Sequence, residues 1–321
     1  MHGLWAVYKK ELSDHFSSYR FVLLFALIAM VSFITSSMAG LSLRASLESM
    51  EKQRYIFLML FNTTGALFSM VQFVAFFGPL IGIVLGFDAI NRERAHGTLI
   101  KVVSQPIYRD AVVNGKFLAG VTTISVVLIS IVLMISGFGL ALLGAVPSSG
   151  EIWRLFFYVI ISIFYISFWL GLSILFSILF RNIATSALAS IALWIFLSFF
   201  VSISADVLAK SIAPIDKPGG VDPEMVIKNA RIKEAVSLIS PMVLYRNATA
   251  TVIDPMRNTT KSMVLMGPME QLSASRFKNP LSLGQSFLVV FPHIVAMIAI
   301  TLICFAISYL VFMVQEILPS L

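Results

Sequence analysis

The sequence predicts an all-α membrane protein with six transmembrane helices. Of its 321 residues, 58% are hydrophobic and only 12% are charged, and the mean hydropathy is +0.92. Soluble domains carry about 25% charged residues. The apolar residues also form uninterrupted stretches of the roughly 20 residues that a helix needs to cross a bilayer. Strands of a membrane barrel would instead alternate apolar and polar residues over about ten positions.

Six apolar stretches divide the chain into regions. We expect transmembrane helices at residues 21–41, 68–90, 117–143, 155–180, 184–207 and 287–314. Residues 1–20 form an amphipathic segment, and residues 21–207 hold the first five helices with a polar loop at 88–116. Residues 208–286 form a long polar segment, and residues 287–321 hold the sixth helix and a short tail.

Lysine and arginine residues near the ends of the helices predict the orientation, because such residues are enriched in cytoplasmic loops. With the N-terminus inside, the cytoplasmic positions are Lys9, Lys10, Arg20, Arg92, Arg94, Lys101, Arg109, Lys116 and Arg181. The short external loops hold fewer, namely Arg44, Lys52, Arg54 and Arg154. Both termini and the 88–116 loop are therefore predicted to be cytoplasmic, and 208–286 to be external. The formal charge of +7 is explained by contact with anionic lipid, and it does not indicate a nucleic-acid partner.

The N-terminal segment has an amphipathic pattern. Leu4, Tyr8, Leu12, Phe16 and Tyr19 recur at helical spacing on one side. We expect a helix that lies flat in the membrane interface, in contact with the lipid headgroups. Such a helix serves either as a simple anchor or as a contact for a partner.

Motifs for catalysis and cofactor binding are missing. Residues 114–117, NGKF, contain a Gly-Lys pair but neither the upstream glycine nor the following hydroxyl of a phosphate-binding loop. There is no H-E-x-x-H motif and no G-x-S-x-G motif. We predict no catalytic residue, no metal site and no cofactor on this chain. The apolar stretches carry almost no ionisable residues, which argues against a proton-driven carrier.

The polar loop from residue 87 to residue 116 is the most highly charged run in the chain. We expect its first helix to break at Gly97, and a second helix to open at Pro106. Between them lies an apolar group, consisting of Leu99, Ile100, Val102 and Val103. An apolar plug with a charged rim suits docking into a groove on a partner. The alternative is an amphipathic loop that rests on lipid headgroups.

The same loop resembles the cytoplasmic signature of a known family. The matching residues are Phe87, Asp88, Glu93, Arg94, Gly97, Thr98, Leu99, Ser104, Pro106, Arg109, Gly115 and Lys116. In this order they resemble the ABC-2 type permeases, which are the membrane subunits of type V ABC exporters. The chain is most similar to the branch that contains the sodium-efflux permeases and the permease of nitrous oxide reductase maturation. Residues 4–20 and 237–248 are also similar to segments of that branch.

The resemblance implies a complex in the cell membrane of a prokaryote. A second permease subunit, identical or related, would pair with this chain, and two copies of a separate ABC ATPase subunit would hold ATP and Mg. The resemblance also implies a coupling helix at 98–104 that inserts into the ATPase. The coupling residues are then Glu93, Arg94, Gly97, Thr98, Leu99, Val102, Pro106 and Arg109. In this family the N-terminal helix also touches the ATPase.

The fifth apolar stretch carries a row of polar residues at every fourth position. The row consists of Ser186, Ser190, Trp194, Ser198, Ser202 and Asp206. Small hydroxylated residues allow close packing of helices, and the alternative is a weakly polar lining of a translocation path. The resemblance implies a path between the first, second and fifth helices of two subunits. Its candidate residues are Gln72, Phe73, Phe76, Phe77, Ser190, Ser198 and Ser202.

Two functions are open at this point. In the first, the chain is the permease of an ATP-driven exporter and moves a substrate across the membrane. In the second, it is a mechanotransmitter that uses ATP hydrolysis to act on an extracytoplasmic partner without moving a solute. The external segment 208–286, for which we expect a helix after Pro223, would be a lid, a gate or the docking site of that partner.

Overall fold

The structure, a computed structural model, describes residues 2–47, 55–62, 69–95, 97, 108–144, 146–214, 223–257, 259–260 and 280–314. Every regular element in these ranges is helical, and no strand is found among them. The chain divides into two compact units. Residues 1–192 and 298–321 make up the first unit, and residues 193–297 make up the second.

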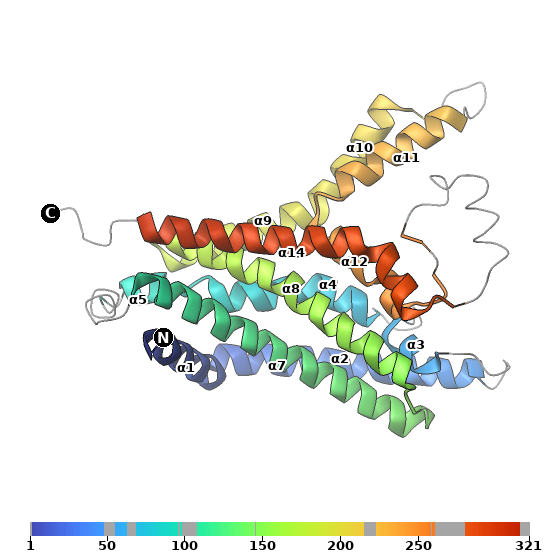
Figure 1. Cartoon of the computed structure of the whole chain (residues 1–321), viewed down its shortest axis with the longest axis horizontal. Coiled ribbons are helices and arrows are strands. Elements are labelled where there is room, and N and C mark those ends of the chain that lie inside the picture. Colours follow the sequence, from blue (N-terminus) through green and yellow to red (C-terminus); the bar gives the residue numbers. More distant parts are fainter. Residues whose placement is uncertain are drawn as a thin grey trace. The chain divides into compact units, whose positions relative to one another are not determined.

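The helices of the first unit begin with α1 (His2–Ser17), α2 (Tyr19–Leu47), α3 (Ile56–Asn62), α4 (Met70–Gly86) and α5 (Asn91–Ala95). They continue with α7 (Arg109–Leu143), α8 (Ser149–Leu179), most of α9 (Ile183–Ile195) and the last part of α14 (Leu283–Val314). Figure 1 shows α1 as a short helix beside the beginning of α7, and the two helices are in contact.

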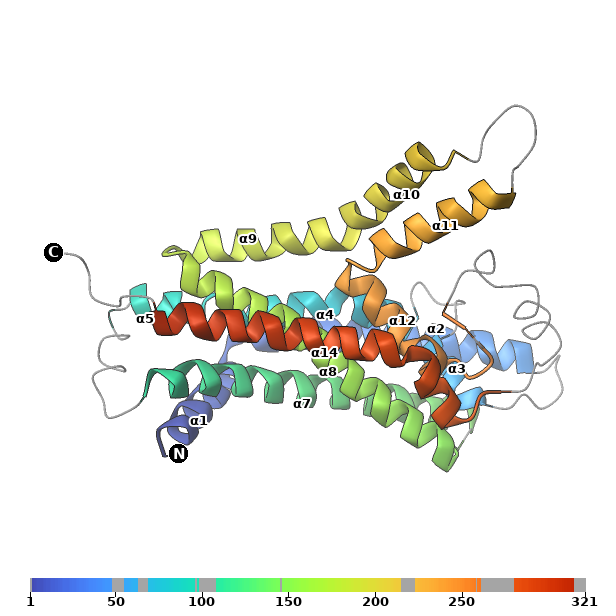
Figure 2. The same ribbon diagram turned by 45° about the horizontal axis from the view of Figure 1, so that its top comes forward.

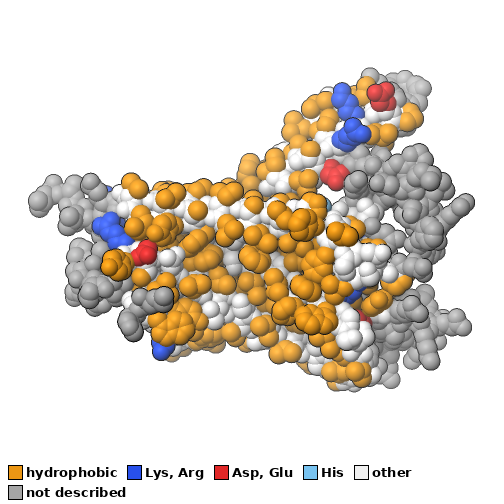
Figure 3. All heavy atoms as spheres, viewed as in Figure 1, with side chains coloured by type: hydrophobic (Ala, Val, Ile, Leu, Met, Phe, Trp, Pro, Cys, Tyr) orange, Lys and Arg blue, Asp and Glu red, His pale blue; other side chains and the backbone are white. Residues whose placement is uncertain are grey.

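Among the described residues, six helical segments are long and apolar enough to cross a membrane, as the sequence predicts. They are 19–41, 70–95, 109–142, 149–179, 183–212 and 283–314. On the face seen in Figure 3, most of the described side chains along the helices of the first unit are apolar. The third of these helices begins at Arg109, earlier than the predicted residue 117, and the fifth continues to Ile212 instead of 207. Hydropathy marks where a helix enters lipid, whereas backbone hydrogen bonding continues through the polar turns beyond it.

Close contact between α4 and α8 holds the centre of the first unit together. Glycines occupy positions 78, 82 and 86 of α4, one turn apart on the face toward α8. A Cβ atom at Gly82 would lie 2.6 Å from the carbonyl oxygen of Ile166, and one at Gly86 would lie 2.8 Å from that of Leu170. Only glycine allows the backbones to approach this closely.

A proline in α4 is accommodated by a hydrogen bond from α8. Pro79 has no N–H group, so the carbonyl of Ala75 loses the donor that the next helical turn would provide. The hydroxyl of Tyr165, which is fully buried, donates to that carbonyl at 2.7 Å. This bond satisfies a backbone oxygen where no water is available.

Side-chain caps mark the beginnings of α4 and α8. Ser69 and Gln72 form a reciprocal capping box at the start of α4, and Ser148 and Glu151 form another at the start of α8. Each box satisfies backbone N–H groups that have no partner within the helix. Gln72, a candidate for the translocation path, therefore has a structural role as a cap.

The second unit contains a helical hairpin. The elements of this unit are the end of α9, the π-helix η1 (Phe196–Phe200), α10 (Val201–Ile212), α11 (Pro223–Ser237), α12 (Pro241–Ile253) and the first part of α14. The hairpin is formed by α10 and α11. Helices α10 and α11 lie side by side in both views (Figures 1 and 2), joined by an ion pair of 2.6 Å between Lys233 Nζ and Asp206 Oδ1. The helix predicted after Pro223 is confirmed as α11.

The bond between α8 and the proline turn gives a first testable prediction. Replacing Tyr165 with Phe leaves the carbonyl of Ala75 buried without its donor, and we expect a loss of about 1–3 kcal/mol in the free energy of unfolding. In a Pro79→Ala background the helix supplies its own N–H donor, so the same replacement should cost much less. Unfolding of the purified single and double variants in detergent measures both values. Equal losses in the two backgrounds would show that the proline does not create the need for this bond.

Candidate functional site

The polar loop predicted from the sequence emerges from two helices that the structure describes. A turn at residues 87–90 leads from α4 into the short helix α5, and α7 begins at Arg109. Gly97 has φ of +65°, and its N–H donates to the carbonyl of Arg94 at 3.1 Å. The break predicted at Gly97 is thus confirmed, because this backbone conformation favours glycine. Thr98, Leu99, Val102 and Pro106 lie outside the described residues.

We call α5 and the first turns of α7 the two stems of this loop. A buried lysine of α7 points toward the other stem. Lys116, in the third turn of α7, has a side chain that is 4% exposed. Its ammonium group lies 2.7 Å from Glu11 Oε1 in α1 and 3.1 Å from Glu93 Oε1 in α5. One side chain thereby connects three helices that are far apart in the sequence.

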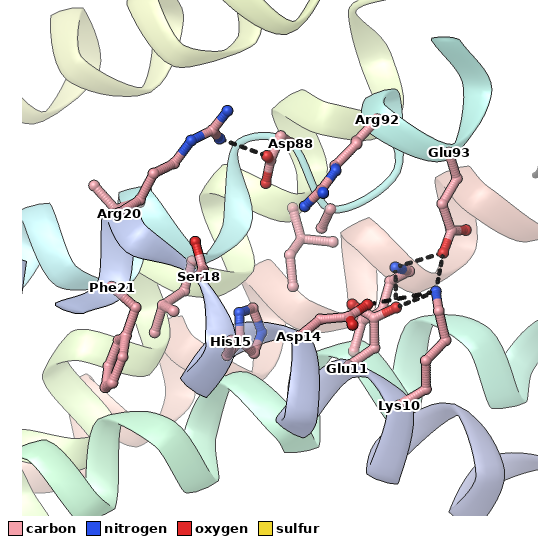
Figure 4. A pocket seen from close by; sticks show the side chains of 15 residues that line it. Lys10, Glu11, Asp14, His15, Ser18, Arg20, Phe21, Asp88, Arg92 and Glu93 are labelled. Carbon is pink, nitrogen blue, oxygen red and sulfur yellow. Dashed lines mark hydrogen bonds and ion pairs between the residues drawn. The ribbon is translucent and has the colours of Figure 1, made fainter. Parts of the chain in front are cut away.

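Lys10 completes an ion-pair cluster, which we define as Lys10, Glu11, Glu93 and Lys116. The ammonium group of Lys10 lies 3.2 Å from the same carboxylate oxygen of Glu11 and 3.2 Å from that of Glu93. Each of these glutamate oxygens therefore accepts from both lysines. Figure 4 labels Lys10, Glu11 and Glu93 of the cluster. Removing one partner from a buried ion pair typically costs about 3–5 kcal/mol, because a charge is left without compensation.

The cluster forms because α1 crosses α7 at a glycine. A Cβ atom at Gly115 would lie 2.8 Å from Val7 Cγ1, so the helices approach closely just where Lys116 follows. Val7 and Glu11 are buried on this face of α1. The predicted apolar stripe is a different face of α1, since Leu4, Tyr8 and Leu12 are half-buried and Phe16 is 39% exposed. The stripe follows amphipathicity alone, whereas close backbone contact and ion pairing decide which residues α1 buries.

A second, more exposed contact supports the other side of the turn. Arg20, at the beginning of α2, lies 2.8 Å from Asp88 and has its guanidinium over the ring of Phe87 at 5.7 Å. The Arg20 side chain is 62% exposed. Exposed ion pairs contribute about 0–1 kcal/mol, so the buried cluster is the stronger attachment.

A polar cavity of about 280 Å³ lies beside the cluster, between α1, the start of α2 and the turn into α5. In Figure 4 Arg92 reaches down into it and His15 lies at its lower edge. The lining residues are Lys10, Glu11, Asp14, His15, Ser18, Arg20, Phe21, Val84, Leu85, Asp88, Ala89, Arg92, Glu93, Lys116 and Ile174. Acidic and basic groups balance in this lining. The cavity can hold water or a small polar group.

Burial and neighbouring charges shift the pKa values in α1. Burial raises the pKa of Glu11, but the ammonium of Lys116 and then that of Lys10 outweigh it and hold this pKa below its usual range. Burial lowers the pKa of Lys10, but Glu11 and Glu93 outweigh it and raise this pKa. Burial also lowers the pKa of His15, although Glu11 attracts the protonated form.

The predicted coupling residues that the structure describes lie at the base of the loop. Glu93 is buried in the cluster, Arg94 is half-buried in α5, and Arg109 is the first residue of α7. The sequence motif included Lys116, but its partner Glu11 was missed. The adjoining Gly115 was the available signal, since a glycine within a helix often marks the close approach of another helix.

The predicted path residues fall into both units. In the first unit, Phe73 is buried, Phe76 and Phe77 are half-buried, and Gln72 caps α4. Ser190 is fully buried, and its hydroxyl lies 3.3 Å from that of Ser173 in α8. Its contacts are those of helix packing.

Ser198 and Ser202 belong to the second unit. Ser198 is buried within η1, and Ser202 is half-buried in α10.

Comparison with known proteins decides the family. The family model described as ABC-2 family transporter protein matches residues 5–317. The chain belongs to the ABC-2 transporter family. Among curated proteins, none matches this chain. The ABC-2 match covers nearly all of α1, the loop with its two stems and all of α14, so the resemblance found in the loop is confirmed for the family as a whole. An ABC-2 protein is a membrane permease of an ABC transporter, a class that works with an ABC ATPase.

The titration of α1 in this ABC-2 permease gives a second prediction. His15 has a lowered pKa when folded, so its contribution to stability is present above the ordinary value of 6.5 and is lost as the pH falls through the folded value. The corresponding loss for Glu11 begins only below 4.5, and that for Lys10 only above 10.5. The protection factors of the α1 amides, which are corrected for the intrinsic pH dependence of exchange, should therefore fall as the pH is lowered below 6.5.

His15→Gln should reduce this loss of protection, because glutamine does not titrate. The charged groups around His15 are Glu11, Asp14, Asp88 and Lys116, and they are unchanged in the variant. An identical pH dependence in wild type and His15→Gln would contradict the assignment of the step to His15.

Proposed function

We propose that this chain is the permease subunit of an ABC exporter and couples ATP hydrolysis by a separate ATPase subunit to substrate movement. The observation that carries the proposal is the buried Lys116, which joins both stems of the 88–116 loop to α1. A loop that receives force from a partner must be attached firmly at its base, and an ion-pair cluster among three helices provides such an attachment. Membership of the ABC-2 family supplies the expected partner.

The finer features of this proposal come from the resemblance. The complex contains two copies of the ATPase, which bind ATP and Mg, and a second permease subunit, most simply an identical one. The loop faces the cytoplasm of a prokaryotic cell, and the coupling helix at 98–104 inserts into the ATPase. By the same resemblance, the chain is assigned to the branch of the sodium-efflux permeases and the permease of nitrous oxide reductase maturation.

The hairpin of α10 and α11 favours a second candidate, the mechanotransmitter. Along α10 the side chains of Ile203, Val207 and Ile212 are each more than half exposed. Ion pairing between Lys233 and Asp206 braces the hairpin, which would suit a lever that acts on an extracytoplasmic partner. Vesicles that hydrolyse ATP with no solute moving, but with the hairpin changing its accessibility, would support this candidate over the exporter.

Charge introduced into the coupling helix tests the first proposal. If residues 98–104 dock into an apolar groove of the ATPase, the changes Leu99→Asp and Val102→Asp bury unpaired charge, which typically costs a few kcal/mol. We expect at least about a hundredfold weaker assembly. The permease should still insert and express normally, while ATPase co-purification and permease-stimulated hydrolysis are lost.

Val146→Asp is the matched control. This valine follows the C-terminal cap of α7 and is 80% exposed, so the same kind of change should leave the complex intact. If the double variant binds and stimulates the ATPase like wild type, the loop is an interfacial segment and the proposed coupling is wrong.

A further inference from the structure

The beginning of α5 is capped by another helix. Ile90 and Asn91 donate their backbone N–H groups to the hydroxyl of Ser177 in α8, at 2.9 and 3.1 Å. The first N–H groups of a helix have no partner within it, and a side chain from the same segment usually caps them. Here the acceptor is 86 residues away in the sequence and fully buried. The start of α5 is therefore fixed to α8.

The side chain of Asn91 extends this contact to the fifth span. Asn91 is fully buried, and its Nδ2 lies 3.5 Å from the carbonyl oxygen of Asn182, at the long end of hydrogen bonding. Asn182 initiates α9: its Oδ1 accepts from the N–H of Ala184 at 2.8 Å, and its carbonyl accepts from that of Ser186 at 3.1 Å. Asn91 thus contacts the residue from which the fifth span begins.

Further hydrogen bonds continue along the same helices. Ser190 in α9 donates to the carbonyl of Ser186, and its hydroxyl lies 3.3 Å from that of Ser173 in α8. Ser173 also donates to the carbonyl of Ile83 in α4 at 3.1 Å. All these serines are fully buried. Buried hydrogen bonds therefore join α8 to α4, α5 and α9.

We propose that Asn91, Ser177 and Asn182 form a joint that transmits displacement of the loop to the fifth span. The three residues are positioning residues, and they act through α5 and α9 without touching substrate. This inference rests on the proposed function, since it supposes that an ATPase moves the loop. It deepens that function by adding a route to the transmembrane bundle that is separate from the ion-pair cluster on α1.

Two variants test the joint in the full-length permease co-expressed with its ATPase. Ser177→Ala removes the acceptor of two N–H groups, and Asn91→Leu removes the amide at nearly constant volume. Both variants should retain ATPase co-purification, while permease-stimulated hydrolysis falls about tenfold, the effect of one or two lost hydrogen bonds. Ser177→Thr, which keeps the hydroxyl, should regain much of the stimulation.

Ser167→Ala is the matched control. Ser167 lies on the same helix and is 4% exposed, and its hydroxyl has no hydrogen-bond partner among the described residues. This variant should stimulate hydrolysis like wild type. Normal stimulation by Ser177→Ala and Asn91→Leu would overturn the joint, and so would loss of co-purification, because the residues would then only support docking. Failure of the wild-type permease to bind its ATPase would instead overturn the proposed function.

A cross-link gives a second test, in which stimulation is compared before and after bridging of the same folded protein. In a Cys304→Ala background, Asn91→Cys and Asn182→Cys together allow α5 and the start of α9 to be bridged by a short bifunctional thiol reagent. If α5 and α9 move as one body, bridging should restore the stimulation that Asn91→Cys alone reduces. Stimulation that stays low or stops after bridging would contradict the proposal.

Discussion

The buried ammonium group of Lys116 determines how the loop stems are attached to the rest of the molecule. It lies within 3.1 Å of carboxylates from α1 and α5 while its own helix leads out of the loop. A charge that is 4% exposed is stable only when it is fully paired. The three helices are therefore held together jointly, because separating either of them would leave that charge uncompensated. The apolar parts of the helices carry no such charge and do not depend on ion pairs.

Within the membrane-spanning helices, close backbone packing takes the role that ion pairs have at the loop stems. The glycines of α4 bring its backbone against α8, and hydroxyl groups of Tyr165 and Ser173 bond to carbonyls of α4. In a medium without water, close packing and satisfied backbone groups are the interactions that remain. The loop stems are thus attached in two ways, by ion pairs to α1 and by buried hydrogen bonds to α8 and α9. Movement of the stems would displace α1 through the first set of contacts, and α8 and α9 through the second.

The sequence was sufficient for the helices and for the importance of the loop. Apolar length alone reveals a membrane-crossing helix, and Gly97 and Pro223 are local signals that the structure confirms. Gly115 signals a helix contact beside Lys116, but the sequence does not identify Glu11 as the partner. The two residues are 105 positions apart, and a charged residue on a polar helix face looks like any other. Asn91 was missed for the same reason, since its burial depends on Ser177, 86 residues away.

Exchanging the charges of Glu11 and Lys116 tests the central claim most directly. The variants Glu11→Lys and Lys116→Glu, alone and combined, would be compared by hydrogen exchange of the α1 amides in the purified permease. Each single change should lower the protection of α1 by about 3 kcal/mol or more. The double variant should lose at least about 2 kcal/mol less than the sum of the two single losses, because the attraction between positions 11 and 116 is restored with opposite polarity. It should not reach wild-type protection, because position 11 then repels Lys10 and position 116 repels Glu93. Fully additive losses in the double variant would contradict the role of Lys116 in holding α1 to the loop stems.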